Sequence, residues 1–363
     1  MGLYAVLMIA VQQPHVQRFM GKMVAEALQA KLGTKVEVGR INLGFFNRII
    51  IDDIMIYDQQ QQKMLQANRL TARPELLPLT KGNIAISSAQ IFGVKANLYK
   101  PSASEPTNFQ FVVDSLASKD TTHHTPLDLN INSFIIRHSS VRYDQNDIAT
   151  TPGRFNAHHI NVHDISAHII LKTLTDDSLN IKVKRLALKE KSGLDIQSIA
   201  FLLSANKNTA RLSNFELSLP QSSISIDSIK ATFNTDRLKE TFKFGVSGFI
   251  ASITPSDIAF LIPQLNNYDN AISIKAKAKG TANDFSFNDI RIASDDKDIK
   301  LLANGSLHLA NTKPTWTANI TDLTIGKKTF EYIDRNISKL PEQLLRAGTI
   351  LWKGTLGYDT EGT

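Results

Sequence analysis

The sequence contains no cysteine among its 363 residues. This absence excludes a disulfide-stabilised scaffold, a thiolate metal site and a cysteine nucleophile. Aromatic residues make up only 7% of the chain, and the formal net charge of +7 comes from lysines and arginines that are scattered rather than clustered. Such a charge indicates solubility or a mild attraction to anionic lipid, and we expect no nucleic-acid partner.

Motifs of common catalytic sites are also missing. The sequence has no G-x-x-x-x-G-K-[ST], no H-E-x-x-H and no G-x-S-x-G. Four histidines, His158, His159, His163 and His168, cluster in HHINVHDISAH, but they have no glutamate in reach and match no closed zinc-site spacing. We therefore expect no metal, no cofactor and no enzymatic activity.

The apolar run at the N-terminus is short. Leu3 to Val11 (LYAVLMIAV) spans nine residues, whereas a membrane-spanning helix needs roughly 20. No Lys or Arg precedes the run, as one would in a signal peptide. We expect residues 1–13 to be the remnant of an N-terminal membrane anchor whose first half is missing; a short buried segment is the alternative.

The next segment, residues 14–32, has the pattern of an amphipathic helix. Pro14 suits the first helical turn, and Gly33 suits a left-handed stop. One face collects Val16, Phe19, Met20, Met23, Val24, Ala27 and Leu28. This helix is predicted to cap the end of a β-core or to lie at a membrane surface, and one helix can do both.

From residue 33 to 326 the sequence alternates as β-strands do. Residues 127–132 (LDLNIN), 215–219 (FELSL) and 272–279 (ISIKAKAK) place apolar residues on one face and polar residues on the other. Such strands are typical of antiparallel sheets with one solvated face. Helices are expected only as interruptions, from Thr254 through Leu261 and over residues 327–348, and residues 349–363 are predicted to begin a further, truncated β segment.

The alternation slips by one residue at a recurrent pattern. An apolar-x-apolar triplet is followed by two small or polar residues and then by another apolar-x-apolar triplet. The nine two-residue spacers are Asp52-Asp53, Ser87-Ser88, Asn132-Ser133, His163-Asp164, Gln197-Ser198, Asp227-Ser228, Ser247-Gly248, Asn288-Asp289 and Thr321-Asp322. Asp52-Asp53 alone resembles a catalytic carboxylate pair, but eight sister copies in the same slot favour a structural role.

An extra residue in a strand is a β-bulge, which bends the strand and returns the same face inward. Hairpin turns at the spacers are the alternative, and they are disfavoured because none of the spacers is Asn-Gly or Asp-Gly. Repeated bends predict a mainly β fold: a long, twisted, antiparallel sheet bent into an open hydrophobic trough. A closed core filled by its own side chains is the other possibility.

An open trough next to a membrane anchor suggests a path for lipid. Exposing an acyl chain to water costs about 0.8 kcal/mol per methylene, on the order of 12 kcal/mol for sixteen carbons. An apolar track removes most of this barrier. We expect the apolar residues that flank the spacers to contact acyl chains, namely Ile49, Ile51, Ile54, Ile56, Ile84, Ile86, Leu129, Ile131, Phe285, Phe287, Ile290 and Ile292.

Several segments carry a family resemblance. Residues 11–65 (VQQPHVQRFMGKMVAEALQAKLGTKVEVGRINLGFFNRIIIDDIMIYDQQQQKML) resemble the start of TamB-like proteins of the AsmA superfamily, in their Bacteroidota form. Residues 97–116, 186–196 and 340–363 are similar to later blocks of that family. The resemblance covers essentially the whole chain; its first block is specific and its middle blocks are generic.

The resemblance implies a periplasmic protein with a single-pass anchor in the bacterial inner membrane. Its β-groove would carry phospholipid acyl chains between the inner and outer membranes and support outer-membrane biogenesis. Family members have a longer anchor, and they continue to a C-terminal region that meets an outer-membrane assembly partner, which is absent here. The alternative function is a scaffold or chaperone that assembles outer-membrane β-barrel proteins by strand addition at an open edge.

Overall fold

The structure is a computed structural model, and it describes residues 12–44, 48–74, 86–116, 131–175, 177–309 and 314–358. The chain divides into an N-terminal unit, residues 1–176 and 181–192, and a C-terminal unit, residues 177–180 and 193–363. Of the described residues, 59% lie in strands and 18% in helices. This helix share is far below a third, and the mainly β fold predicted from the sequence is confirmed.

The strands form one 17-stranded sheet. The N-terminal unit holds β1 (Val36–Gly44), β2 (Arg48–Tyr57), β3 (Lys63–Pro74), β4 (Ile86–Phe92), β5 (Lys95–Lys100), β6 (Ile131–Gln145) and β7 (His159–Thr175), and β8 (Ser178–Glu190) has residues in both units. The C-terminal unit holds β9 (Asp195–Asn206), β10 (Thr209–Ser218), β11 (Ser223–Thr232), β12 (Lys243–Ile253), β13 (Ile272–Thr281), β14 (Asp284–Ser294), β15 (Ile299–Leu309), β16 (Pro314–Ile325) and β17 (Ile350–Tyr358).

The strand pairs β1–β2, β2–β3, β3–β4, β3–β5 and β6–β7 are antiparallel. From β9 to β17 each strand pairs antiparallel with the next in the chain. In the N-terminal unit, β4 and β5 together occupy one strand position beside β3, and both run parallel to β6. The sheet is therefore mixed, and it is mostly antiparallel.

The N-terminal helix is α2 (Pro14–Leu32), which starts at Pro14 and ends at a left-handed Gly33, as the sequence predicts. It covers β1: a Cβ atom at Gly21 would lie 3.2 Å from the carbonyl oxygen of Val38, and the Gln29 amide donates to the carbonyl of Val36 at 3.1 Å. The buried positions of α2 are Gln17, Gly21 and Ala25. Of the apolar residues expected on the contact face, Val16, Met20, Val24 and Leu28 are half-buried, whereas the others are exposed. Phe19 and Met23 are 63% and 55% exposed, because only a small residue allows the helix so close to the strand backbone.

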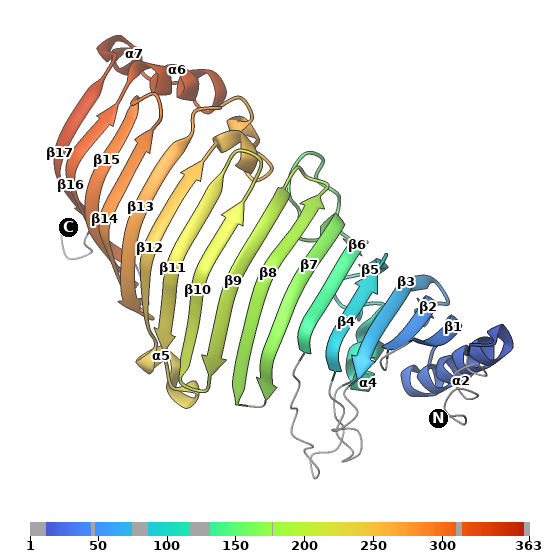
Figure 1. Cartoon of the computed structure of the whole chain (residues 1–363). Helices are drawn as coiled ribbons and strands as arrows, with labels where there is room; N and C mark the ends of the chain where they lie inside the picture. Colours follow the sequence, from blue (N-terminus) through green and yellow to red (C-terminus); the bar gives the residue numbers. More distant parts are fainter. Residues whose placement is uncertain are drawn as a thin grey trace. The chain divides into compact units, whose positions relative to one another are not determined.

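The other helices are short and lie at strand ends. They are α4 (Gln110–Leu116) in the N-terminal unit and η1 (Thr235–Arg237), α5 (Leu238–Thr241), η2 (Pro255–Ile258), η3 (Pro263–Leu265), α6 (Lys327–Asn336) and α7 (Glu342–Ala347) in the C-terminal unit. In the C-terminal unit, α6 and α7 lie at one end of the strands and α5 at the other (Figure 1). The interruption at 327–348 is confirmed, whereas the helix expected from Thr254 is a single 3₁₀ turn.

All nine spacers lie inside strands, which excludes the hairpin alternative. Four of them place their second residue in the left-handed region: Asp53 (φ 57°), Asp164 (φ 54°), Gly248 (φ 67°) and Asp289 (φ 52°). The strand register shifts by one residue at six spacers, as a bulge requires: Ser87-Ser88, Asn132-Ser133, His163-Asp164, Ser247-Gly248, Asn288-Asp289 and Thr321-Asp322. The bulge interpretation is confirmed at these six spacers.

At Asp52-Asp53 the slip has a different origin. At Asp53 the register with β1 and β3 is unbroken, because the neighbours slip at the same place through Gly39 and Asn68. The pairing continues from Asn68 to Gly93 on the next strand position and from Gly93 to His138 on β6. Gly93 and His138 both have a left-handed backbone. The slips of neighbouring strands in the N-terminal unit are therefore aligned across the sheet.

Candidate functional site

The slips keep apolar residues on one side of the sheet in unbroken rows. In the C-terminal unit, each residue of a row pairs with the next across all nine strands. One row is Leu203, Leu212, Ile229, Val246, Ala278, Phe287, Gly305, Ala318 and Leu356, and a second is Ile199, Leu217, Ile224, Ala251, Ile274, Ile292, Leu301, Leu323 and Trp352. We call the side that carries these rows the apolar face.

The N-terminal unit has an apolar face of the same kind. One of its rows is Ile41, Ile51, Leu70, Ile91, Ile136 and Ala167, and the next is Leu43, Ile49, Ala72, Ala89, Phe134 and Ile169. Both rows cross the parallel step between β4 and β6 without a break. The change of strand direction therefore preserves the continuity of the face.

The apolar face of the C-terminal unit is not a filled core. Among the described residues of this unit, four aliphatic or aromatic side chains are buried: Leu219, Ala251, Ala303 and Phe330. The large members of the two rows are half-buried, and Leu356 is 46% exposed. On β13, Ile272, Ile274, Ala276 and Ala278 are half-buried, while the residue after each of them is exposed. Each apolar side chain is thus shielded only by adjacent side chains of the same sheet, and the face remains open to a ligand.

A hollow of about 800 Å³ lies on the C-terminal unit across β12 to β17. Its apolar lining is one further row, Phe244, Gly280, Phe285, Leu307, Trp316 and Tyr358. Gly280 separates Phe244 from Phe285, and the two rings approach to 5.6 Å between centroids. Ligand pockets are commonly about 300–1,000 Å³ and mainly apolar, so this hollow suits an apolar ligand.

Five of the residues predicted to contact lipid are members of these rows: Ile49, Ile51, Phe285, Phe287 and Ile292. Ile49, Ile51, Ile54 and Ile56 pair with apolar residues of β1 and β3, and Phe285, Phe287, Ile290 and Ile292 do so with residues of β15. All eight are half-buried, as is Ile86. Ile84 and Leu129 lie outside the described residues, and Ile131 is placed only by its backbone pairing with Leu171. The two groups belong to different units, and each is a site in its own unit.

Two acidic spacer residues, Asp52 and Asp289, lie on the polar side of the sheet, away from the apolar face. The Asp52 carboxylate accepts hydrogen bonds from Arg40 Nε at 2.9 Å and Arg69 Nε at 2.6 Å. Asp289 pairs with Lys277 at 2.8 Å, on the polar side of β13. Burial would raise the pKa of Asp52, but the two guanidinium groups outweigh it and lower that pKa below its ordinary value.

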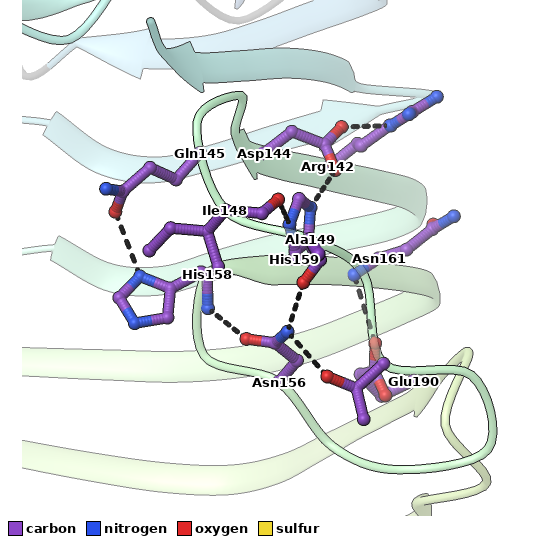
Figure 2. A network of polar contacts seen from close by, with 11 residues as sticks. Arg142, Asp144, Gln145, Ile148, Ala149, Asn156, His158, His159, Asn161 and Glu190 are labelled. Carbon is purple, nitrogen blue, oxygen red and sulfur yellow. Dashed lines mark hydrogen bonds and ion pairs between the residues drawn. The ribbon is translucent and has the colours of Figure 1, made fainter. Parts of the chain in front are cut away.

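A second polar cluster lies in the N-terminal unit, where residues 146–158 connect β6 to β7; we call this segment the 146–158 loop (Figure 2). His159 is its centre. The Nδ1 atom of His159 lies 2.9 Å from Asp144 Oδ1, and its Nε2 atom lies 2.7 Å from the carbonyl oxygen of Ile148. The hydrogen bond to Asp144 is the largest of the causes that raise the pKa of His159. The sequence gives no sign of this network.

The histidine cluster does not converge. His158 contacts Gln145, His163 contacts Asp164, and His168 contacts Ser133. Within the described ranges, no group of three or more histidine, aspartate or glutamate side chains is arranged to hold a metal ion. Among the same residues, no helix has the length and apolar character to cross a membrane; the predicted anchor remnant at 1–13 falls almost entirely outside them.

Comparison of the chain with models of known protein families, with curated proteins and with solved structures finds no match. The resemblance to TamB-like proteins and the functions it implies therefore stay predictions. The functional argument rests on the apolar face and its hollow.

Proposed function

We propose that the apolar face carries the acyl chains of phospholipids while their headgroups stay in water. The observation that supports this proposal is the pair of apolar rows that cross nine strands of the C-terminal unit without a polar interruption. With about 4.8 Å between neighbouring strands, the nine strands span about 38 Å. This span is longer than an extended sixteen-carbon chain, so the chain can contact apolar side chains along its whole length.

The energetic argument concerns the exposed methylenes. A single acyl chain in water carries a cost on the order of 12 kcal/mol, and contact with a half-buried aliphatic face removes much of it. Binding also buries apolar surface of the protein, since side chains such as Leu356 and Trp316 are 46% and 40% exposed without a ligand. Open apolar surface of this extent marks an interaction site in soluble proteins.

The proposed setting follows the resemblance. The protein would be anchored in the bacterial inner membrane, would lie mostly in the periplasm, and would move phospholipid toward the outer membrane. The outer-membrane assembly partner would contact the C-terminal region that the resemblance implies. On this proposal the protein has no enzymatic activity.

The test is photo-crosslinking from the two sides of one strand in the full chain. A photoreactive residue at Ile274 or Ile292, on the apolar face, should capture phospholipid that mass spectrometry identifies. The matched control is Ser273 or Lys275, which are exposed on the opposite side of the same sheet. Equal capture from both sides would reject the acyl-chain proposal.

A second candidate, a scaffold for β-rich clients, is favoured by β17. This strand pairs with β16, and it carries Leu351, Leu356 and Tyr358, which are 74%, 46% and 46% exposed. An exposed apolar strand suits the addition of a further strand. Crosslinks from β17 to polypeptide, with none to lipid from Ile274, would favour this candidate.

A further inference from the structure

The 146–158 loop and the ends of β6, β7 and β8 enclose a polar pocket of about 350 Å³ in the N-terminal unit. Its lining includes Arg142, Arg154, Asn161, Lys191 and Ser192. This pocket is chemically unlike the apolar face, and neither the lipid path nor the scaffold function uses it.

The two acids of the pocket are already satisfied by the protein. Asp144 accepts from Arg142 Nε at 2.5 Å and lies 2.9 Å from His159 Nδ1. Glu190 accepts the backbone N–H groups of Asn161, at 3.1 Å, and Ser192, at 2.7 Å, as well as the Ser192 hydroxyl. Burial would raise the pKa of Glu190, but the hydrogen bonds from Ser192, Asn161 and Lys191 lower it, so this carboxylate is ionised and internally compensated.

The cations of the pocket are not compensated in the same way. Within the described part of the chain, the side chains of Arg154, Lys191 and Asn161 have no hydrogen-bond or ion-pair partner. Three cations, Arg142, Arg154 and Lys191, face two acids, so the lining has a net charge of +1 before His159 is counted. The pocket therefore offers unused donors of the kind that bind oxyanions.

We propose that this pocket binds a phosphate ester, with Arg154 and Lys191 contacting the phosphate oxygens and the Asn161 amide adding a neutral donor. Its volume of about 350 Å³ suits a phosphate with a small alcohol such as glycerol. The phosphate ester has two possible sources, the headgroup of an anionic phospholipid and a water-soluble phosphate ester. The proposal does not rest on the acyl-chain function, because the pocket contains none of the residues of the apolar rows.

His159 makes the site sensitive to pH. Both ring nitrogens face acceptors, Asp144 Oδ1 and the Ile148 carbonyl, and only the doubly protonated ring can donate to both. The other charged groups around the ring are Arg142 on β6, Asp147 and Arg154 on the loop, and Glu190 and Lys191 at the end of β8. The pKa of His159 is raised above the ordinary histidine value. At a pH at or below that ordinary value the ring is protonated and holds the loop by both hydrogen bonds, and this support is lost as the pH rises through the raised pKa.

The first arm of the test uses soluble probes on the full chain. Inorganic phosphate and glycerophosphoglycerol, an anionic diester without acyl chains, are titrated by calorimetry. The double variant Arg154→Gln/Lys191→Gln should weaken binding of the diester at least tenfold, whereas Lys95→Gln, an exposed cation on β5, should leave it unchanged. Lys191→Gln alone should weaken binding of the diester. Lys191→Arg, which keeps the positive charge, should retain most of the wild-type affinity.

The second arm uses vesicles and pH. If the headgroup of a lipid is the natural source, vesicles of phosphatidylglycerol bind the wild-type chain, phosphatidylcholine vesicles do not, and soluble diester competes. Binding of the soluble diester alone assigns a water-soluble source. Affinity should fall as the pH rises in the wild type but not in His159→Gln, which also separates this site from a general surface charge. Absence of diester binding, or a double variant that binds as well as the wild type with its circular dichroism unchanged, would overturn the proposal, and neither result bears on lipid capture at Ile274.

Discussion

Gly248 on β12 lies directly opposite Asp227 on β11, and a Cβ atom at position 248 would overlap the Asp227 carboxylate. Gly248 is left-handed, with φ 67°, and the β12–β13 register shifts across it. Backbone conformation and close approach therefore both require glycine at this point. The relationship fixes where β12 bends. The apolar residues before and after the bend therefore lie on the same face of the sheet.

Gly248→Ala should destabilise the protein by about 2–3 kcal/mol, since the alanine must leave the left-handed region or push Asp227 aside. The matched control is Gly245→Ala on the same strand, where the added methyl group meets open space. Urea unfolding followed by circular dichroism measures both. Equal stability of the two variants would show that the bend does not depend on this glycine.

The left-handed aspartates make a different prediction. Asp53→Val should cost about 1–2 kcal/mol, because a β-branched side chain is strained at φ 57°, whereas Asp53→Asn or Asp53→Gly should be tolerated. Asp322 also occupies a spacer but is not left-handed, so Asp322→Val should lose only its ion pair with Lys300. The thermal midpoints of these four variants test the order; a larger loss at Asp322 than at Asp53 would contradict it.

Asp52 predicts a dependence of stability on pH. Its folded-state pKa is lowered, so its contribution is present above the unfolded-state pKa, about 3.9, and is lost as the pH falls through the folded value. Asp52→Asn should therefore destabilise the protein by about 1–3 kcal/mol at neutral pH and by little in strong acid. Urea midpoints at several pH values check this.

The control for that experiment is Asp289→Asn. Asp289 pairs with Lys277, but both side chains are more than half exposed, and asparagine tolerates the left-handed backbone. We expect no resolvable change. A pH-independent loss in Asp52→Asn would indicate that packing, rather than the two guanidinium contacts, supports this residue.

The strands, the cap helix and the bends could be predicted because each has a local signal. Pro14 and Gly33 delimit α2, and the slip at Asp53 or Gly248 is visible as two consecutive polar or small residues between apolar triplets. Alternation also identified the residues of the apolar rows, because side-chain parity fixes the face. These features depend on neighbours within a few residues.

Other features depend on residues far apart in the sequence. Gly21 packs on β1 through a close approach that helical periodicity cannot reveal, so the larger residues Phe19 and Met23 were assigned to the wrong face. The parallel pairing of β4 with β6 needs the connection between them, which alternation does not describe. The His159 network joins β6, β7 and the 146–158 loop, and its residues are polar in the same way as any solvated strand.

The continuity of the apolar rows makes the last prediction. Ile292 pairs with Ile274 on one side and Leu301 on the other, so Ile292→Arg places a charge in the middle of a row. A charge against hydrocarbon costs roughly 2.5–3.5 kcal/mol, which corresponds to about a hundredfold loss of acyl-chain affinity. Ser273→Arg puts the same charge on the exposed side of β13 and should leave lipid binding unchanged. Lipid co-purifying with each folded variant, quantified by mass spectrometry, is the measurement. Wild-type lipid content in Ile292→Arg would mean that lipid does not follow this row, and the scaffold function at β17 would then be the better explanation of the open apolar surface.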